Sequence, residues 1–78
     1  MSHNPAMHQL RSPLQAQIVH WLVVPGDPIH QGDVLVILES MKMEHEVRAQ
    51  AGGRVVELLY AVGDLVNAND LLLISEHL

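Results

Sequence analysis

The chain contains an internal repeat, and this feature restricts its possible folds more than any other. A shift of 37 positions aligns residues 12–39 with residues 49–76, and eight of the aligned pairs are identical. The identical pairs are Val19 with Val56, Leu22 with Leu59, Gly26 with Gly63, Asp27 with Asp64, Asp33 with Asp70, Leu35 with Leu72, Ile37 with Ile74, and Glu39 with Glu76. Sequences rich in Val and Leu align easily by chance, but here the Gly-Asp pairs and the later aspartates share one register. We therefore infer two copies of one structural unit.

Each copy has the pattern of β-structure. Short runs rich in Val, Ile and Leu are separated by Gly, Pro, Asn and Asp, and no stretch has a helical period. The strands that we expect cover residues 9–12, 17–23, 28–29, 34–40, 43–49, 54–60, 65–66 and 71–75. Because neither copy can bury its apolar face alone, we expect the two to pack face to face about a pseudo-twofold axis. The predicted fold is all-β, a flattened β-barrel or sandwich of two four-stranded antiparallel sheets.

Length and terminal composition predict a single domain. The chain has 78 residues, which is room for one hydrophobic core. Residues 1–8 mix His, Asn, Pro and Ser without an apolar period, so we expect a flexible N-terminal tail followed by one domain at residues 9–78. The Met1 start and the short tail suggest a small, free-standing subunit.

Charge and composition exclude several classes of function. Nine acidic residues against four basic ones give a net charge of -5, which disfavours nucleic acid as a partner. The chain has no Cys, so disulfides and thiolate metal sites are impossible. Its apolar runs, such as residues 34–38 and 58–62, are too short for a bilayer span or a secretion signal. We therefore expect a cytoplasmic protein without a membrane partner.

The segment that joins the two copies, residues 39–47, departs from ordinary turn chemistry. It must reverse the chain between two strands, yet it contains no Gly, Asn, Asp or Pro. A two-residue hairpin turn needs positive φ at both central positions, and here these are Met41 and Lys42. Lys42 is also the only lysine, and Met43 follows it. An exposed tip that violates a local rule suggests function, whereas the alternative is that both methionines fill the core and Lys42 is a solvated charge.

These residues resemble the biotin attachment motif of the biotin carboxyl carrier domains, a branch of the biotinyl/lipoyl attachment family. The resemblance covers most of residues 12–76, and its central element is Met41-Lys42-Met43 preceded by Glu39. In the similar lipoyl domains the lysine is typically flanked by Asp and Ala, so the methionines favour biotin. The further matching residues are Ser12-Pro13, Pro25-Gly26-Asp27, Gly32-Asp33 and Val62-Gly63-Asp64.

Two residues differ from the family pattern, and one insertion that occurs in part of the family is absent. The family usually has Ala before the Met-Lys-Met triplet, where this chain has Ser40, a change between small residues that we expect to be tolerated. It commonly has Gly after Ser-Pro, where this chain has Ala16, although the repeat partner Gly53 keeps the glycine. If that turn required positive φ, Ala16 would be strained. The thumb insertion of one bacterial branch is absent, so the chain resembles the thumbless type.

The resemblance implies a carrier without catalytic residues of its own. A biotin protein ligase would attach biotin covalently to Lys42, with Met41 and Met43 as flanking recognition residues. The carrier would then move a carboxyl group from a biotin carboxylase to a carboxyltransferase. An acyl-CoA carboxylase such as acetyl-CoA carboxylase, in fatty acid biosynthesis, is the expected parent, although other acyl-CoA, pyruvate and urea stay open as acceptors. The glutamates of residues 39–46 would provide docking charge or form only a solvated acidic surface.

Other interpretations remain to be compared with the carrier. A catalytic set built on His20, His30 or His45 lacks any nucleophile or phosphate-binding motif around it. A metal site at Glu44-His45-Glu46 is disfavoured because Glu44 and Glu46 share one face of a strand and His45 points to the other, so we expect no metal. An unmodified β-sandwich adaptor would not need the exposed lysine. Lipoate carriage in an oxo-acid dehydrogenase complex is the closest alternative.

Overall fold

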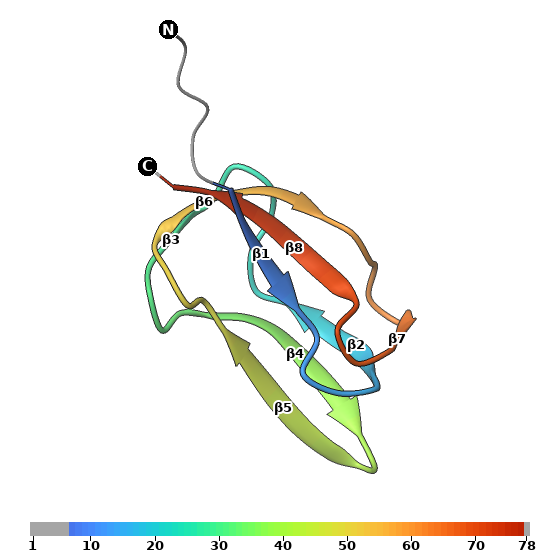
Figure 1. Ribbon diagram of the computed structural model, residues 1–78. Helices are drawn as coiled ribbons and strands as arrows, with labels where there is room; N and C mark the ends of the chain where they lie inside the picture. The colour runs from blue at the N-terminus through green and yellow to red at the C-terminus, as the bar shows by residue number, and fades with distance from the viewer. Residues whose placement is uncertain (1–6, 78) are drawn as a thin grey trace, which may run out of the picture.

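Eight strands form two four-stranded antiparallel sheets in the computed structural model, which describes residues 7–77 (Figure 1). The order of the first sheet is β1-β8-β6-β3, and that of the second is β5-β4-β2-β7. The strands are β1 (Met7–Arg11), β2 (Ala16–Trp21), β3 (Pro28–Ile29), β4 (Val34–Ser40), β5 (Met43–Arg48), β6 (Gly53–Leu58), β7 (Leu65–Val66) and β8 (Leu71–Glu76). The predicted all-β fold of two packed sheets is therefore confirmed.

The first strand begins earlier than the sequence predicted. Met7 and His8 belong to β1 and pair with Glu76 and Ser75 of β8, so the last two residues of the expected tail are part of the domain. The sequence did not predict this start because β1 buries only Leu10, so the strand lacks the alternation of apolar and polar residues that marks a half-buried strand. The rest of the expected tail, residues 1–6, lies outside the described residues.

Strands β2 and β6 end two residues before their predicted ends, at Trp21 and Leu58. At these points the chain leaves one sheet and crosses to the other, because β2 and β3 lie in different sheets, as do β6 and β7. Ala16, where we considered strain, lies in β2 opposite Val66 and does not have positive φ. The remaining strands match their predicted bounds to within one residue.

The predicted pseudo-twofold relation holds for every strand. The 37-residue shift relates β1, β2, β3 and β4 to β5, β6, β7 and β8, and the exchange converts the order of one sheet into that of the other. The repeat therefore extends beyond the aligned residues to β1 and β5, where Arg11 corresponds to Arg48 and His8 to His45. Each sheet consequently contains strands from both copies.

Four turns of one kind hold the copies together. In each turn a residue with positive φ precedes an aspartate, whose carboxylate accepts a hydrogen bond from the amide three residues earlier. The positive-φ residues are Gly26, Gly32, Gly63 and Asn69. Their amides bond across the pseudo-twofold axis, for example from Gly26 to the carbonyl of Val55 and from Gly63 to that of Ile18, both at 2.8 Å. Each copy thus depends on the other.

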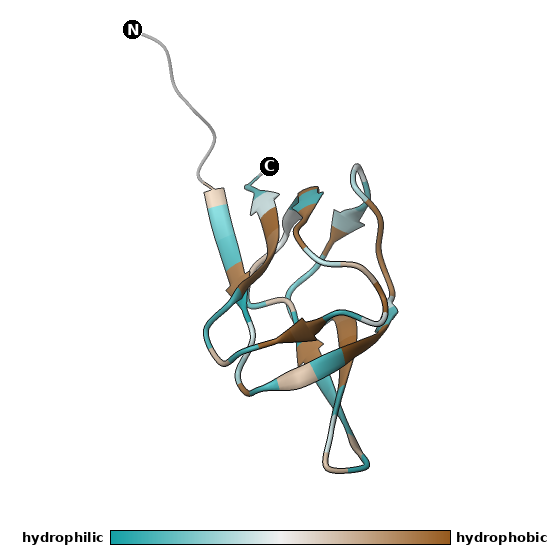
Figure 2. Cartoon of the chain, turned by 90° about the vertical axis from the view of Figure 1, so that its right-hand side faces the viewer, coloured by the Kyte–Doolittle hydropathy of each residue, from teal (hydrophilic) through white to brown (hydrophobic). Residues whose placement is uncertain are grey.

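The core lies between the two sheets and consists of aliphatic side chains. Its largest fully buried members include Ile18, Leu35, Leu38, Leu72 and Leu73. Figure 2 shows hydrophobic residues gathered on the strands in the middle of the molecule, with the β4–β5 hairpin extending beyond them. The segment that joins the copies therefore projects from this packed region. No helix among residues 7–77 is long and apolar enough to cross a membrane.

Candidate functional site

The tip of the β4–β5 hairpin has the turn geometry that the sequence predicted. Ser40 and Met43 form the last ladder pair, and only Met41 and Lys42 connect them. Their φ angles are 53° and 65°, so both central residues occupy the left-handed region, as in a type I′ turn. Side chains other than Gly, Asn and Asp cost about 1–2 kcal/mol per residue in that region. The tip is thus strained where the sequence lacks turn residues.

The tip presents its side chains to solvent. Met41 is 91% exposed and Met43 is 63% exposed, and Lys42 is exposed between them. The alternative that the methionines fill the core is therefore wrong. Lys42 has no ion-pair partner within residues 7–77. An accessible amine without a competing carboxylate suits covalent attachment of a cofactor through an amide bond.

The base of the hairpin is fixed by packing on one strand and by an arginine on the other. In β4, Val36 and Leu38 are fully buried, and β4 pairs with both β2 and β5. In β5, the Arg48 guanidinium donates to the carbonyl of Gly32 and to the Glu46 carboxylate, each at 2.8 Å. The tip therefore projects from a rigid support, and its strained turn is held by the strands on both sides.

Sequence reasoning missed the role of Arg48. The signal was present, because Glu46 and Arg48 lie two residues apart on a strand and so share a face. Arg11 repeats the arrangement across the pseudo-twofold axis, with bonds to the carbonyl of Asn69 and to the Gln9 side chain at 2.9 Å. These two arginines attach the edge strands β1 and β5 to turns of the opposite copy.

The acidic residues near the tip fall into two groups. Glu39 and Glu44 lie directly opposite each other across the ladder, and neither has an ion-pair partner in the described part of the chain. Like charges in this arrangement repel. Glu46 instead pairs with Arg48 at 2.8 Å. Of the three glutamates considered for docking, only Glu39 and Glu44 therefore add uncompensated charge beside Lys42.

The other candidate residues do not assemble into a site. Within residues 7–77, no three His, Cys, Asp or Glu side chains are placed to hold one metal ion. His30 instead contacts the Asp33 carboxylate of its own turn at 3.7 Å. At the segment that crosses from β6 to β7, partial burial and the carboxylates of Asp70 and Asp64 raise the pKa of Tyr60. None of these features lies at the hairpin tip.

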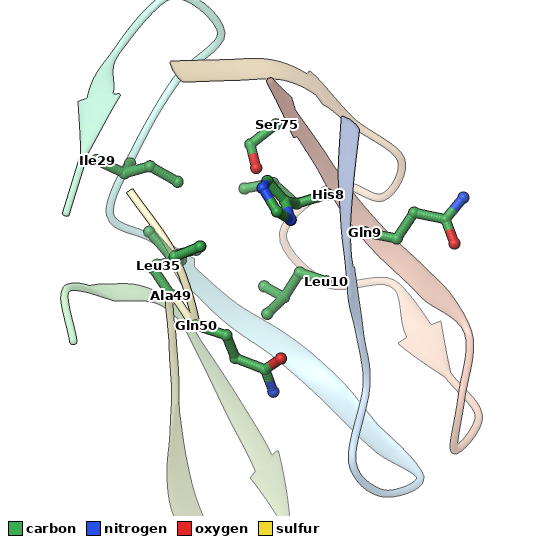
Figure 3. A pocket seen from close by; sticks show the side chains of 10 residues that line it. His8, Gln9, Leu10, Ile29, Leu35, Ala49, Gln50 and Ser75 are labelled. Carbon is green, nitrogen blue, oxygen red and sulfur yellow. The ribbon is translucent and has the colours of Figure 1, made fainter. Parts of the chain in front are cut away.

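A cavity of about 70 Å³ opens between the sheets near the start of β4, at the end of that strand opposite the tip. Figure 3 shows His8 and Leu10 of β1 on one side and Ile29, Leu35 and Ala49 on the other. Its small volume and its position separate it from Lys42. The hairpin tip is consequently the candidate site.

A comparison with known protein families identifies the family of the chain. The model of the Biotin_lipoyl family, described as "Biotin-requiring enzyme", matches residues 8–74. This range includes all of β2 to β7, both arginines that attach the edge strands, and the whole hairpin tip.

Two curated proteins match a shorter part of the chain. The gamma subunit of glutaconyl-CoA decarboxylase from Acidaminococcus fermentans is 49% identical over 35 residues, which are 45% of this chain and 24% of that protein. A homolog of biotinylated protein TB7.3 from Mycobacterium leprae is 51% identical over 35 residues, which are 45% of this chain and 49% of that protein. This chain therefore matches about half or less of the length of each relative.

Solved structures match over nearly the whole chain. A single-chain, multi-domain long-chain acyl-CoA carboxylase gives a TM-score of 0.88 at 31% identity, covering 100% of this chain and 8% of that one. The urea carboxylase of Kluyveromyces lactis gives 0.85 at 29% identity, over 96% of this chain and 7% of that one. The lipoyl domain of the 2-oxoglutarate dehydrogenase complex from Azotobacter vinelandii gives 0.74 at 25% identity, over 88% and 96%.

Proposed function

Because the chain belongs to the Biotin_lipoyl family of biotin-requiring enzymes, we propose that it is the carrier of a biotin-dependent carboxylase and that biotin is attached to Lys42. The observation that carries this proposal is the position of the chain's only lysine. Lys42 lies at the centre of a strained, exposed turn, on a hairpin whose base is fixed by buried side chains. An amine that must enter several active sites needs this combination of exposure and rigid support.

The chain contributes a nucleophile and a support. A biotin protein ligase would present biotinyl-AMP, and the neutral Lys42 amine would attack its carbonyl carbon, forming an amide and releasing AMP. Met41 and Met43 offer an apolar surface on either side of the amine for contact with the ligase. Once bound, biotin supplies the ureido group that holds and transfers the carboxyl group, so the carrier itself needs no catalytic residue.

We also propose which class of biotin-dependent carboxylase this carrier serves. We assign the carrier to an acyl-CoA carboxylase, with acetyl-CoA carboxylase of fatty acid biosynthesis as one such enzyme, acting with a biotin carboxylase and a carboxyltransferase in the cytoplasm. The match to a segment of a long-chain acyl-CoA carboxylase, with a TM-score of 0.88 over 100% of this chain, supports this choice, and the score of 0.85 with urea carboxylase supports biotin-dependent carboxylases in general. The lower score of 0.74 with the lipoyl domain, together with the flanking methionines, favours biotin over lipoate.

The test is modification of the full chain in cells that contain active biotin and lipoate ligases. Intact mass and peptide mapping should find one biotinyl group on Lys42. Lys42→Arg should abolish labelling while the far-UV circular dichroism and thermal unfolding stay unchanged, because the residue makes no ion pair with the described chain. Ser40→Ala, next to the turn, serves as the matched control and should be labelled.

Each other outcome would change the assignment. Biotin on the Lys42→Arg variant would show that the attachment site lies elsewhere. A lipoyl group on Lys42 would assign the chain to an oxo-acid dehydrogenase complex. No modification, under conditions that label a control carrier, would leave an unmodified adaptor as the function.

A further inference from the structure

The described methionines all lie at the surface, which is unusual for this residue type. Met41 is 91% exposed, Met43 is 63% exposed and Met7 is 52% exposed. Methionine normally fills gaps in hydrophobic cores, and the core of this protein is aliphatic and contains none among its described residues. Two of the three methionines flank the proposed attachment lysine.

Local geometry makes the two tip methionines accessible to small oxidants. Met41 lies in the left-handed region at the end of a projecting hairpin, and Met43 occupies the last ladder pair next to it. With 91% of Met41 in solvent, almost no neighbouring atom covers its thioether. A methionine sulfur in this position can be reached by a small oxidant without any unfolding of the chain.

We propose that Met41 and Met43 are reversible oxidation sites, and that a sulfoxide at the tip blocks attachment of biotin to Lys42. This inference rests on the proposed function of Lys42. The physical reason is that oxidation replaces an apolar, polarizable side-chain end with a polar one that carries a strong hydrogen-bond acceptor. A ligase surface shaped for thioethers would then bury an unpaired oxygen, which is unfavourable.

The oxidant is hydrogen peroxide. The thioether sulfur attacks one peroxide oxygen, a sulfur–oxygen bond forms, and the oxygen–oxygen bond breaks. The remaining hydroxide takes the proton from the transferred oxygen and leaves as water, so sulfur is oxidised by two electrons and peroxide is reduced. Methionine sulfoxide reductase reverses the change with a dithiol as reductant, which releases the oxygen as water and becomes a disulfide.

The experiment compares labelling before and after oxidation. The full unmodified chain is treated with hydrogen peroxide, peptide mapping locates the sulfoxides, and initial biotinylation rates are measured with purified ligase, biotin and ATP. We expect sulfoxide at Met41 and Met43, a fall in labelling rate of about tenfold or more, and recovery after treatment with methionine sulfoxide reductase. Thermal unfolding should not change, because neither side chain belongs to the core.

Two variants separate the tip from the rest of the chain. Met7→Leu removes the exposed methionine of β1, outside the hairpin, and should leave both the labelling rate and its peroxide sensitivity unchanged. The double variant Met41→Leu with Met43→Leu should have the same labelling rate before and after peroxide, whatever that rate is.

The outcomes distinguish this inference from the proposed function. Sulfoxide at both tip methionines with an unchanged labelling rate would overturn the inference and leave Lys42 as the attachment site. Oxidation of Met7 without oxidation of the tip would also overturn it. If the untreated chain is not labelled at Lys42, the proposed function fails and the inference fails with it.

Discussion

Residues with positive φ are of two kinds in this protein. In the four supporting turns the position is held by Gly26, Gly32, Gly63 or Asn69, which tolerate the left-handed region. At the hairpin tip the same region is occupied by methionine and lysine, which do not. In the supporting turns the residue types are those that the left-handed conformation favours. Only at the candidate site is this conformation occupied by residue types that it disfavours. A local rule that is broken only at one exposed turn, by Met41 and Lys42, is typical of residues retained for function.

The position of Gly53 leaves no room for a side chain, so even a substitution by alanine should lower the free energy of unfolding. A Cβ atom at Gly53 would overlap the backbone carbonyl oxygen of Glu76 in the adjacent strand β8, and a backbone atom cannot rotate away. Gly53→Ala should therefore lower the free energy of unfolding by about 2 kcal/mol. Urea denaturation measures this change.

The neighbouring glycine provides the control. A Cβ at Gly52 would meet the carbonyl of Ile29 at 3.4 Å, an ordinary contact, so Gly52→Ala should alter the free energy of unfolding by no more than about 0.5 kcal/mol. Equal effects of the two substitutions would contradict this account of Gly53.

At the scale of elements, the four aspartate turns are the units that join the copies. In each turn the aspartate carboxylate accepts a hydrogen bond from the first amide of the turn, and the backbone bonds to a residue of the other copy that lies in a strand or directly after one. The turns are equivalent except at one position, where Asn69 replaces glycine. The aspartate bond and the backbone bonds to the other copy occur in all four turns, so Asn69 shows which residue besides glycine the positive-φ position accepts.

Asn69→Ala should therefore destabilise the protein. The φ angle of Asn69 is 72°, a left-handed conformation that asparagine tolerates and alanine does not, so we expect a loss of about 1 kcal/mol in the free energy of unfolding. Asn67→Ala, at the start of the same turn, is the matched control. Its φ is not positive, so this substitution should change the free energy of unfolding by no more than about 0.5 kcal/mol. Denaturation of both variants measures the difference, and equal effects of the two substitutions would contradict the explanation.

The elements also show where sequence reasoning was sufficient. The repeat register, the Gly-Asp turns and the short apolar runs predicted all eight strands, and the requirement of a two-residue hairpin predicted positive φ at Met41 and Lys42. The start of β1 was missed because an edge strand with one buried side chain has no periodic signal. The contacts of Arg48 with Gly32 depend on how the copies interlock, which residue patterns do not specify.

For the whole molecule, the cavity between the sheets marks a place where the two halves differ in side chains. Two lining residues, Ala51 and Ser75, correspond in the repeat to Leu14 and Leu38. Leu38 is fully buried, and Leu14 packs against the core. Three other lining residues are larger than their repeat partners: Leu10 against Val47, Ile29 against Val66 and Leu73 against Val36. The cavity of about 70 Å³ therefore lies at a site where side-chain size differs in both directions, and Ala51 and Ser75 are its smaller members.

Ala51→Leu, which copies the residue of the other half, should partly fill this space. The cavity is partly open to solvent and has exposed polar residues such as Gln9 and Gln50 in its lining, so the gain should be smaller than for a closed core cavity, and we expect about 0.5 kcal/mol in the free energy of unfolding. Ala61→Leu, at an exposed position, should bring no comparable gain. Labelling of Lys42 should be unchanged, because the cavity lies near the start of β4 and the lysine follows its end. A loss of stability in Ala51→Leu would mean that the walls of the cavity cannot accept the larger side chain, and the two halves would then differ in backbone as well as in side-chain volume.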